Sequence, residues 1–189
     1  MTAIEFPILS TDSLILDQLI HSDASHVFKI FSDSQVVEHY DVDKFKTELD
    51  AIRLIKHFDV LFESNSGIRW AIRDKNTMQL IGSCGFVNWN PFDHTAVISY
   101  ELATEYWGRG YASQAVTAMI NHVFAESFQF YVHRIEAYIS PSNLASEKLI
   151  KKHKFEFEGT LREKSYWGDA FHDMNMFSLL NREWSRSNS

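Results

Sequence analysis

A glycine-rich segment at residues 104–112 is the part of this sequence best suited to do chemistry, because it stands directly before a strongly amphipathic helix pattern. Gly108 and Gly110 permit backbone angles that are closed to other residues, so successive amide hydrogens can converge at the amino end of that helix. The helix dipole favours negative charge at the same place, and Arg109 can add a charge-assisted contact. The segment therefore predicts a phosphate-binding site made of main-chain donors.

Two glycines at this spacing are equally compatible with a tight strand-to-helix connection that binds nothing. The Gly-Lys-Ser/Thr ending of a P-loop is absent, which disfavours nucleoside triphosphate chemistry. A dinucleotide-binding fold normally carries its glycine turn after the first of several parallel strands, whereas several strand patterns precede this one. A nucleotide-containing cofactor remains the expected ligand.

Hydrophobic periodicity defines the elements that must hold this segment in place. A period of two marks strands, and apolar residues three and four apart mark helices. The expected helices cover residues 24–31, 45–62, 112–124 and 143–153, and the expected strands cover residues 13–16, 68–72, 78–89, 96–102, 134–139, 155–162 and 172–180. This order predicts an antiparallel meander followed by a βαβ crossover, and so an α+β domain with a mixed sheet.

With these motifs the sequence resembles the GNAT family of acyl-coenzyme A dependent N-acetyltransferases, particularly its ribosomal-protein N-terminal (Rim-like) branch. Residues 107–112 match the family's coenzyme A loop, Gln/Arg-x-x-Gly-x-Gly/Ala, with Trp107 in place of the usual Gln or Arg. Residues 143–146 and 155–162 are similar to the branch's Asn-x-x-Ser and Phe-x-x-Glu-Gly stretches. The resemblance implies a single GNAT domain over residues 1–189, frayed at 185–189, with a mixed, mostly antiparallel sheet of six or seven strands and about four helices.

The resemblance also implies acetyl-coenzyme A as cosubstrate, without a metal. In the family its pantetheine arm lies in a gap between the strand before the glycine loop and the strand before Asn143. The expected coenzyme A contacts are Leu102, Ala103, Trp107, Gly108, Arg109, Gly110, Tyr111, Ala112, Ser140, Asn143 and Ser146. Asn143 and Ser146 also suit a pair that only caps the later helix, and the two roles are compatible.

Acyl transfer to an amine needs a neutral amine, a polarised thioester carbonyl and a proton for the departing thiolate. The resemblance implies that Glu101 accepts the amine proton through water; a solvated glutamate on the strand face is the alternative. Many family members use a tyrosine of the later helix as the acid, but Ile150 stands at that place. Ser146 is then the candidate acid, as in the Rim-like branch, although Ser165 replaces the glutamate that partners it in some of that branch.

The acceptor is expected to be a protein α-amine. Neutralising an α-amine near pH 7 costs about 1 kcal/mol, against about 4.6 kcal/mol for a lysine amine, so a weak base serves the first better. A polyamine or aminoglycoside acceptor is the alternative within enzymes, and an acyl-coenzyme A binding module without turnover is the alternative outside them. The residues expected to wall the acceptor slot, each of which also suits ordinary packing, are Phe31, His39, Tyr40, Trp89, Tyr166 and Trp167.

Composition limits the other possibilities. The chain has 189 residues and a net charge of −7, which disfavours binding to nucleic acid and suits a basic partner. Cys84 is the only cysteine, so a disulfide within the chain is excluded and a reducing cytoplasm fits. No signal sequence or membrane-spanning stretch is evident, and the nine histidines show no metal-binding spacing. A monomer and a homodimer are both compatible with the sequence.

Overall fold

A mixed sheet of eight strands forms the centre of the protein, in the spatial order β1-β2-β3-β4-β5-β6-β8-β7. The computed structural model describes residues 5–40, 42–125 and 131–185. Most of the tail expected to fray, from residue 186 onward, lies outside these residues. The strands are β1 (Leu9–Ser10), β2 (Leu14–Gln18), β3 (Ile68–Asp74), β4 (Leu80–Asn90), β5 (Thr95–Leu102), β6 (Arg134–Ile139), β7 (Glu156–Trp167) and β8 (Ala170–Leu180).

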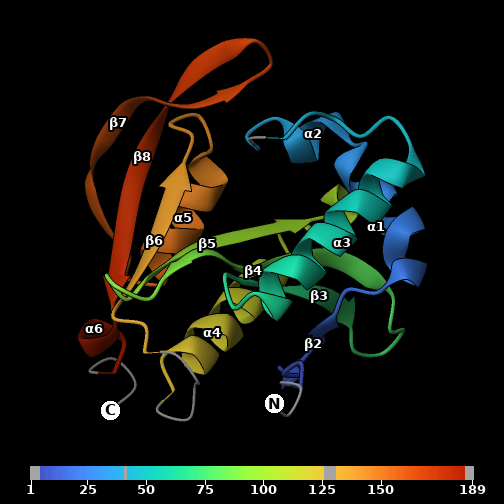
Figure 1. Ribbon diagram of the computed structural model, residues 1–189, viewed down its shortest axis with the longest axis horizontal. Coiled ribbons are helices and arrows are strands. Elements are labelled where there is room, and N and C mark those ends of the chain that lie inside the picture. Colours follow the sequence, from blue (N-terminus) through green and yellow to red (C-terminus); the bar gives the residue numbers. More distant parts are fainter. Residues whose placement is uncertain (1–4, 41, 126–130, 186–189) are drawn as a thin grey trace.

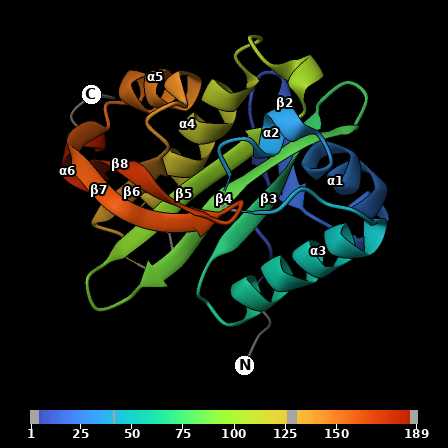
Figure 2. The same ribbon diagram turned by 90° about the horizontal axis from the view of Figure 1, so that it is seen from above.

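Helices cover both faces of the sheet (Figure 1). They are α1 (Ala24–Phe31), α2 (Ser34–Val37), α3 (Glu48–Glu63), α4 (Tyr111–Val123), α5 (Leu144–Lys152) and α6 (Asn181–Ser185). Seen from above, α1 and α3 lie on one side of the sheet and α4 and α5 on the other (Figure 2). Two buried cores follow from this layering, one beneath α4 and α5 and one beneath α1 and α3.

The sheet confirms the predicted topology. Strands β2 to β5 pair antiparallel in chain order, and β5 is joined to β6 in parallel through α4, as a βαβ crossover requires. The expected α+β architecture with a mixed sheet is confirmed, with eight strands where six or seven were expected, because β1 is a two-residue strand on the edge. The four predicted helices correspond to α1, α3, α4 and α5.

The second helix begins three residues later than its hydrophobic pattern suggests. Thr47 and Asp50 form a capping box, so α3 begins at Glu48. Phe45 lies before this cap and stacks on Phe31, with ring centroids 5.0 Å apart. The apolar period therefore continues across a helix boundary because the residue before the cap also packs into the core.

The pairing of β5 with β6 stops early, which creates the space that positions the site. Residues 95–97 of β5 pair with residues 134–136 of β6, and the two strands then part. Residues 98–102 keep their antiparallel partners in β4, and residues 137–139 keep theirs in β8. The main-chain groups on the facing edges of β5 and β6 are therefore available to a ligand.

One ion pair beyond this gap gives a prediction for stability. Arg134 donates to both carboxylate oxygens of Glu158, at 2.8 and 2.6 Å, and Ser178 donates to one of them. These hydrogen bonds lower the pKa of Glu158 to about 2, so the unfolded chain binds its proton at higher pH than the folded chain does. The stabilisation is therefore present above about pH 4.3 and is lost as the pH falls towards 2.

We expect wild type to lose more stability than Glu158→Gln when urea unfolding is compared at about pH 5 and about pH 2.5. The difference should be below about 1 kcal/mol, because the Glu158 side chain is 39% exposed and water screens the pair. Equal losses in the two proteins would show that the ion pair adds nothing to folding.

Candidate active site

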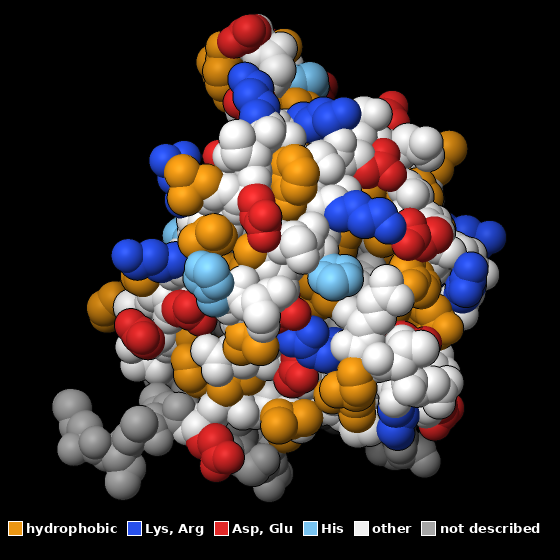
Figure 3. Space-filling model, turned by 90° about the vertical axis from the view of Figure 1, so that its right-hand side faces the viewer, with side chains coloured by type: hydrophobic (Ala, Val, Ile, Leu, Met, Phe, Trp, Pro, Cys, Tyr) orange, Lys and Arg blue, Asp and Glu red, His pale blue; other side chains and the backbone are white. Residues whose placement is uncertain are grey.

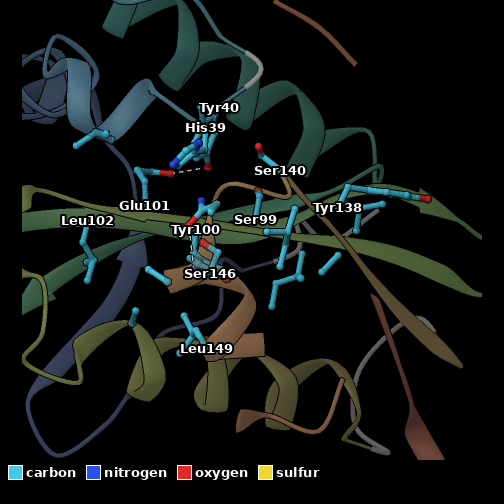
Figure 4. A pocket seen from close by; sticks show the side chains of 18 of the residues that line it. His39, Tyr40, Ser99, Tyr100, Glu101, Leu102, Tyr138, Ser140, Ser146 and Leu149 are labelled. Carbon is cyan, nitrogen blue, oxygen red and sulfur yellow. Dashed lines mark hydrogen bonds between the residues drawn. The ribbon is translucent and has the colours of Figure 1, made fainter. Parts of the chain in front are cut away.

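A cavity of about 1510 Å³ lies at the gap between β5 and β6 and is lined by residues of elements on both faces of the sheet. On the α4 side it is bordered by the glycine loop and the start of α5, and on the other side by α1, α2 and α3. Alternation along β5 places Tyr100 and Leu102 towards the first side and Ser99 and Glu101 towards the second, as Figure 4 shows. One strand therefore supplies side chains to both halves of the cavity.

The glycine loop has the backbone geometry that its sequence predicts. Gly108 and Gly110 have φ angles of 72° and 79°, and Gly110 is the residue that precedes the first turn of α4. A Cβ atom built on either glycine meets no other protein atom within 4 Å, so glycine is needed here for its conformation rather than for space. Tyr111, Ala112 and Ser113, the first three residues of α4, also line the cavity.

Trp107 anchors this loop to the strand before it. Its indole Nε1 donates to the main-chain oxygen of Leu102 at 2.8 Å, and its side chain lines the cavity. Arg109 points elsewhere: its guanidinium lies 5.4 Å above the centre of the Tyr106 ring, and Arg109 is not among the cavity residues. The expected side-chain contact from Arg109 to a phosphate is therefore not preformed.

The other predicted coenzyme A contacts line the cavity, with one correction. Ala103 is outside it, because its N–H donates to the main-chain oxygen of Ile81 and its side chain packs against the core beneath α1 and α3. Leu102 and Ser140 stand on opposite sides of the gap, at the ends of β5 and β6. The remaining lining residues of this group are Trp107, Gly108, Gly110, Tyr111, Ala112, Asn143 and Ser146.

Asn143 and Ser146 form the predicted cap at the start of α5. The side-chain oxygen of Asn143 accepts a hydrogen bond from the main-chain N–H of Ser146 at 3.0 Å. The Ser146 hydroxyl takes no part in this cap, and Ser146 lines the cavity. Because the cap uses only the main chain of Ser146, the predicted cap and the predicted coenzyme A contact are compatible.

Glu101 is held in a buried network rather than in solvent. It is 6% exposed and forms an ion pair with Arg69, which is 3% exposed. Ser83 donates to one carboxylate oxygen, and Tyr40 donates to the other at 2.9 Å. Burial by itself lowers the pKa of the Arg69 guanidinium, but the adjacent Glu101 carboxylate and Tyr40 hydroxyl raise it overall. The solvated alternative for Glu101 is thus wrong.

The comparisons with known proteins agree with this geometry. The family described as "Acetyltransferase (GNAT) domain" matches residues 13–156. The chain belongs to this family. The uncharacterized N-acetyltransferase YoaA of Bacillus subtilis (strain 168) is 34% identical over 175 residues, which are 93% of this chain and 97% of that protein.

One further relative and one solved structure of similar fold have names that state a substrate. The ribosomal-protein-serine acetyltransferase of Escherichia coli (strain K12) is 31% identical over 102 residues, 54% of this chain and 55% of that protein. The structure of RimL, a ribosomal L7/L12 alpha-N-protein acetyltransferase in complex with coenzyme A, has a TM-score of 0.82 at 18% identity. It covers 92% of this chain and 98% of that chain.

The protein is therefore a GNAT enzyme, an acetyl-coenzyme A dependent N-acetyltransferase. Its cavity fits this cosubstrate, because the first turn of α4, which lines the cavity, has main-chain donors that suit a pyrophosphate, and the unpaired edge of β5 suits an amide-containing arm. When bound, acetyl-coenzyme A supplies the acetyl thioester. In residues 5–40, 42–125 and 131–185, no three His, Cys, Asp or Glu side chains gather as a metal site would require.

The structure brings only half of the predicted acceptor residues to the cavity of this GNAT enzyme. Phe31, His39 and Tyr40 line it, and the His39 ring is hydrogen-bonded to Ser142 in the loop before α5, at 3.3 Å.

Among the helices that the structure describes, none has the length and apolarity needed to cross a membrane.

Trp89, Tyr166 and Trp167 lie outside the cavity. Trp89 packs against the core beneath α4 and α5. Tyr166 and Trp167 belong to the β7–β8 hairpin, which projects beyond the rest of the sheet (Figure 1). The Trp167 ring stacks there on His172, with ring centroids 3.6 Å apart, and Tyr166 packs edge-on against Phe171.

Two cavity residues were missed by the sequence analysis. Arg69 interrupts the apolar pattern of β3, and a cation in such a strand was the available signal that a buried anion lies opposite. Tyr100 shares the apolar face of β5 with Ile98 and Leu102, so nothing in the alternation separated it from ordinary core. Both residues become part of the site only once the neighbouring strands and α5 are in place.

Proposed function

We propose that this acetyltransferase modifies the α-amino group at the amino terminus of a protein, of the ribosomal-protein type. The observation that carries the proposal is the engagement of Glu101: both of its oxygens already accept hydrogen bonds, and it is the buried counter-ion of Arg69. Protonating it would leave the Arg69 cation without its partner in the interior. The cavity therefore suits an amine that needs little help in losing its proton.

An α-amine meets this condition better than a lysine or a polyamine. With an ordinary pKa of about 7.7 to 8.0, roughly a tenth of an α-amine is neutral near pH 7, whereas an amine with a pKa of about 10.4 is neutral in fewer than about one molecule in a thousand. The names of the E. coli relative and of RimL, which state a ribosomal-protein acceptor, support the same choice.

The charges on the acceptor side also disfavour a polycation. Glu136, the other strand carboxylate of the cavity, is paired with Arg134 and accepts a hydrogen bond from Tyr138. On the face that carries α1 and α3, acidic and basic side chains are interspersed (Figure 3), so no patch of one sign gathers there. The net charge of −7 is thus not concentrated on this face as a docking surface for a basic partner.

The proposal is tested with three acceptors in parallel: a peptide with a free amino terminus, the same peptide blocked at that end but containing lysine, and spermidine. Intact-mass analysis should show one acetyl group on the first peptide, with a rate that rises between about pH 7 and about pH 8.5 as the amine becomes neutral. Faster acetylation of the blocked peptide or of spermidine would overturn the acceptor assignment. Coenzyme A binding without release of thiol to any acceptor would favour a binding module.

A further inference from the structure

Lysine side chains gather where α5 lies beside the start of α4. Lys148 and Lys152 are one helical turn apart on α5, and both line the cavity. The Lys152 ammonium nitrogen Nζ donates to the Ser113 hydroxyl at 3.0 Å, and Ser113 belongs to the first turn of α4. Ser113 and Lys152 also line a second cavity, of about 490 Å³, together with Lys154. The lysines therefore lie directly beside the helix start that follows the glycine loop.

Neighbouring carboxylates do not neutralise these lysines. Within the part of the chain that the structure describes, Lys148, Lys152 and Lys154 form no ion pair, whereas Lys151 pairs with Glu147 at 2.5 Å. A lysine in the last turn of a helix also suits the helix dipole, but that explanation covers Lys151 as well as Lys152. A cluster of positive charge thus borders the two cavities in a protein whose net charge is −7.

The other basic residues that line the main cavity are engaged elsewhere. Arg69 is the buried partner of Glu101. Lys164 belongs to the β7–β8 hairpin, and its Nζ lies 5.6 Å from the centre of an aromatic ring of β6. Lys148 and Lys152 are therefore the cations that an anion bound beside α4 would meet.

The chemistry of coenzyme A supplies such an anion. Its adenosine carries the pyrophosphate on one carbon of the ribose and a phosphate monoester, the 3′-phosphate, on another, so the two groups bind close together. The monoester has a charge of about −1.5 to −2 at pH 7, more than either phosphate of the pyrophosphate carries. Main-chain amides of the glycine loop suit the pyrophosphate, and compact ammonium charges suit the monoester. Because an ammonium has three donors, Lys152 can bind phosphate without leaving Ser113.

We propose that Lys148 and Lys152 bind the 3′-phosphate of coenzyme A, and that Ser113 is a positioning residue that holds the Lys152 ammonium at the cavity. The site recognises the charge of the monoester, so it distinguishes coenzyme A from dephospho-coenzyme A. Its contacts are the same before and during acetyl transfer, and they therefore contribute to affinity rather than to turnover. The assignment rests on coenzyme A as the ligand of this cavity and not on which amine accepts the acetyl group.

The first test needs no acceptor and compares the binding of coenzyme A and dephospho-coenzyme A by calorimetry. Wild type should bind coenzyme A about 30-fold more tightly. Lys152→Met should lower the affinity for coenzyme A about tenfold and change that for dephospho-coenzyme A less than about twofold. Lys148→Met should lower the first affinity about threefold, and the double variant should bind the two ligands within about twofold of each other.

Lys151→Met is the matched control. Lys151 is as exposed as Lys152 and lies in the same helical turn, but it is paired with Glu147 and does not line the cavity. The variant changes the net charge equally and should keep the wild-type preference for coenzyme A. Raising the salt concentration from about 0.05 M to about 0.5 M should reduce that preference several-fold in wild type, because the lysines are exposed and their charges are screened. In the Lys148→Met, Lys152→Met double variant the same change of salt should have no effect.

Either of two results would overturn the proposal. An equal loss of affinity for both ligands in Lys152→Met would show that Lys152 has a structural role or binds the pyrophosphate. An unchanged preference in the double variant would show that the 3′-phosphate lies elsewhere. Thermal unfolding shows whether each variant is folded. If Lys152→Met is not, Ser113→Ala makes the same comparison, with an expected threefold loss, about, for coenzyme A alone.

The second test is kinetic. With a peptide α-amine as acceptor, Lys152→Met should raise KM for acetyl-coenzyme A about tenfold and leave kcat within about twofold. A lower kcat with an unchanged KM would contradict the proposal, since the residue would then act on the transition state. Failure of every α-amine peptide would count against the acceptor assignment alone, because the calorimetric test stands without it.

Discussion

Gly110→Ala should weaken the binding of coenzyme A about 100-fold while the protein remains folded. Gly110 has a φ angle of 79°, which costs a residue with a side chain about 1–2 kcal/mol. The chain can relieve this strain only by rotating the peptide groups that begin α4, which moves the amide donors facing the cavity. Each hydrogen bond lost to a charged phosphate is worth about 1.5–3 kcal/mol, and about 1.4 kcal/mol is a factor of ten in affinity.

Gly168→Ala is the matched control for this prediction. Gly168 has a φ angle of 55° in the turn between β7 and β8, and it does not line the cavity. Both variants should lower Tm by a similar few degrees, but calorimetry should show weakened binding only for Gly110→Ala. A Cβ at either glycine meets no protein atom within 4 Å, so a steric clash with the protein does not account for a difference. An unchanged affinity of Gly110→Ala for coenzyme A would show that the glycine loop does not bind its phosphates.

The glycine loop was readable from sequence because its chemistry is local. Two glycines before an amphipathic helix determine a left-handed residue and exposed amides without help from distant residues. The strand at Arg134–Ile139 was likewise predicted to the residue, since its alternation of apolar and polar side chains is complete. In contrast, β1, α2 and α6 have two, four and five residues, which is too short for any period to show.

The side chains that line the acceptor half of the cavity depend on strand irregularities that hydrophobic periodicity does not reveal. Val87 lines the cavity, so strict alternation along β4 would bring Trp89 there too. The pairing of β4 with β5 shifts register between Val87 and Asn90, and Asn88 has a φ angle of 53°. This irregularity turns Asn88 and Asn90 towards the cavity and Trp89 towards the core. A single-residue shift in a strand thus reverses the face that every later side chain occupies.

Arg69→Met should lower the free energy of unfolding by about 3–5 kcal/mol, because it leaves the Glu101 carboxylate buried without its cation. The Arg69 guanidinium also donates to Ser83 at 2.8 Å and to Ser99 at 2.5 Å, so these hydroxyls lose a partner as well. Adding Glu101→Gln should recover at least about half of the loss, since the double variant buries no unpaired charge. Urea unfolding of the two single variants and the double variant measures these values.

Lys29→Met provides the comparison, because the Lys29–Glu105 pair has a similar charge arrangement but side chains that are 67% and 48% exposed. Lys29→Met should lower the free energy of unfolding by less than about 1 kcal/mol. If Arg69→Met lowers the free energy of unfolding no more than Lys29→Met does, the Glu101 network does not stabilise the fold. Glu101 would then be a candidate base once more. The pH dependence of kcat in Glu101→Gln then separates the two roles. A structural partner leaves the profile unchanged where the variant is folded, whereas a base removes its acid limb.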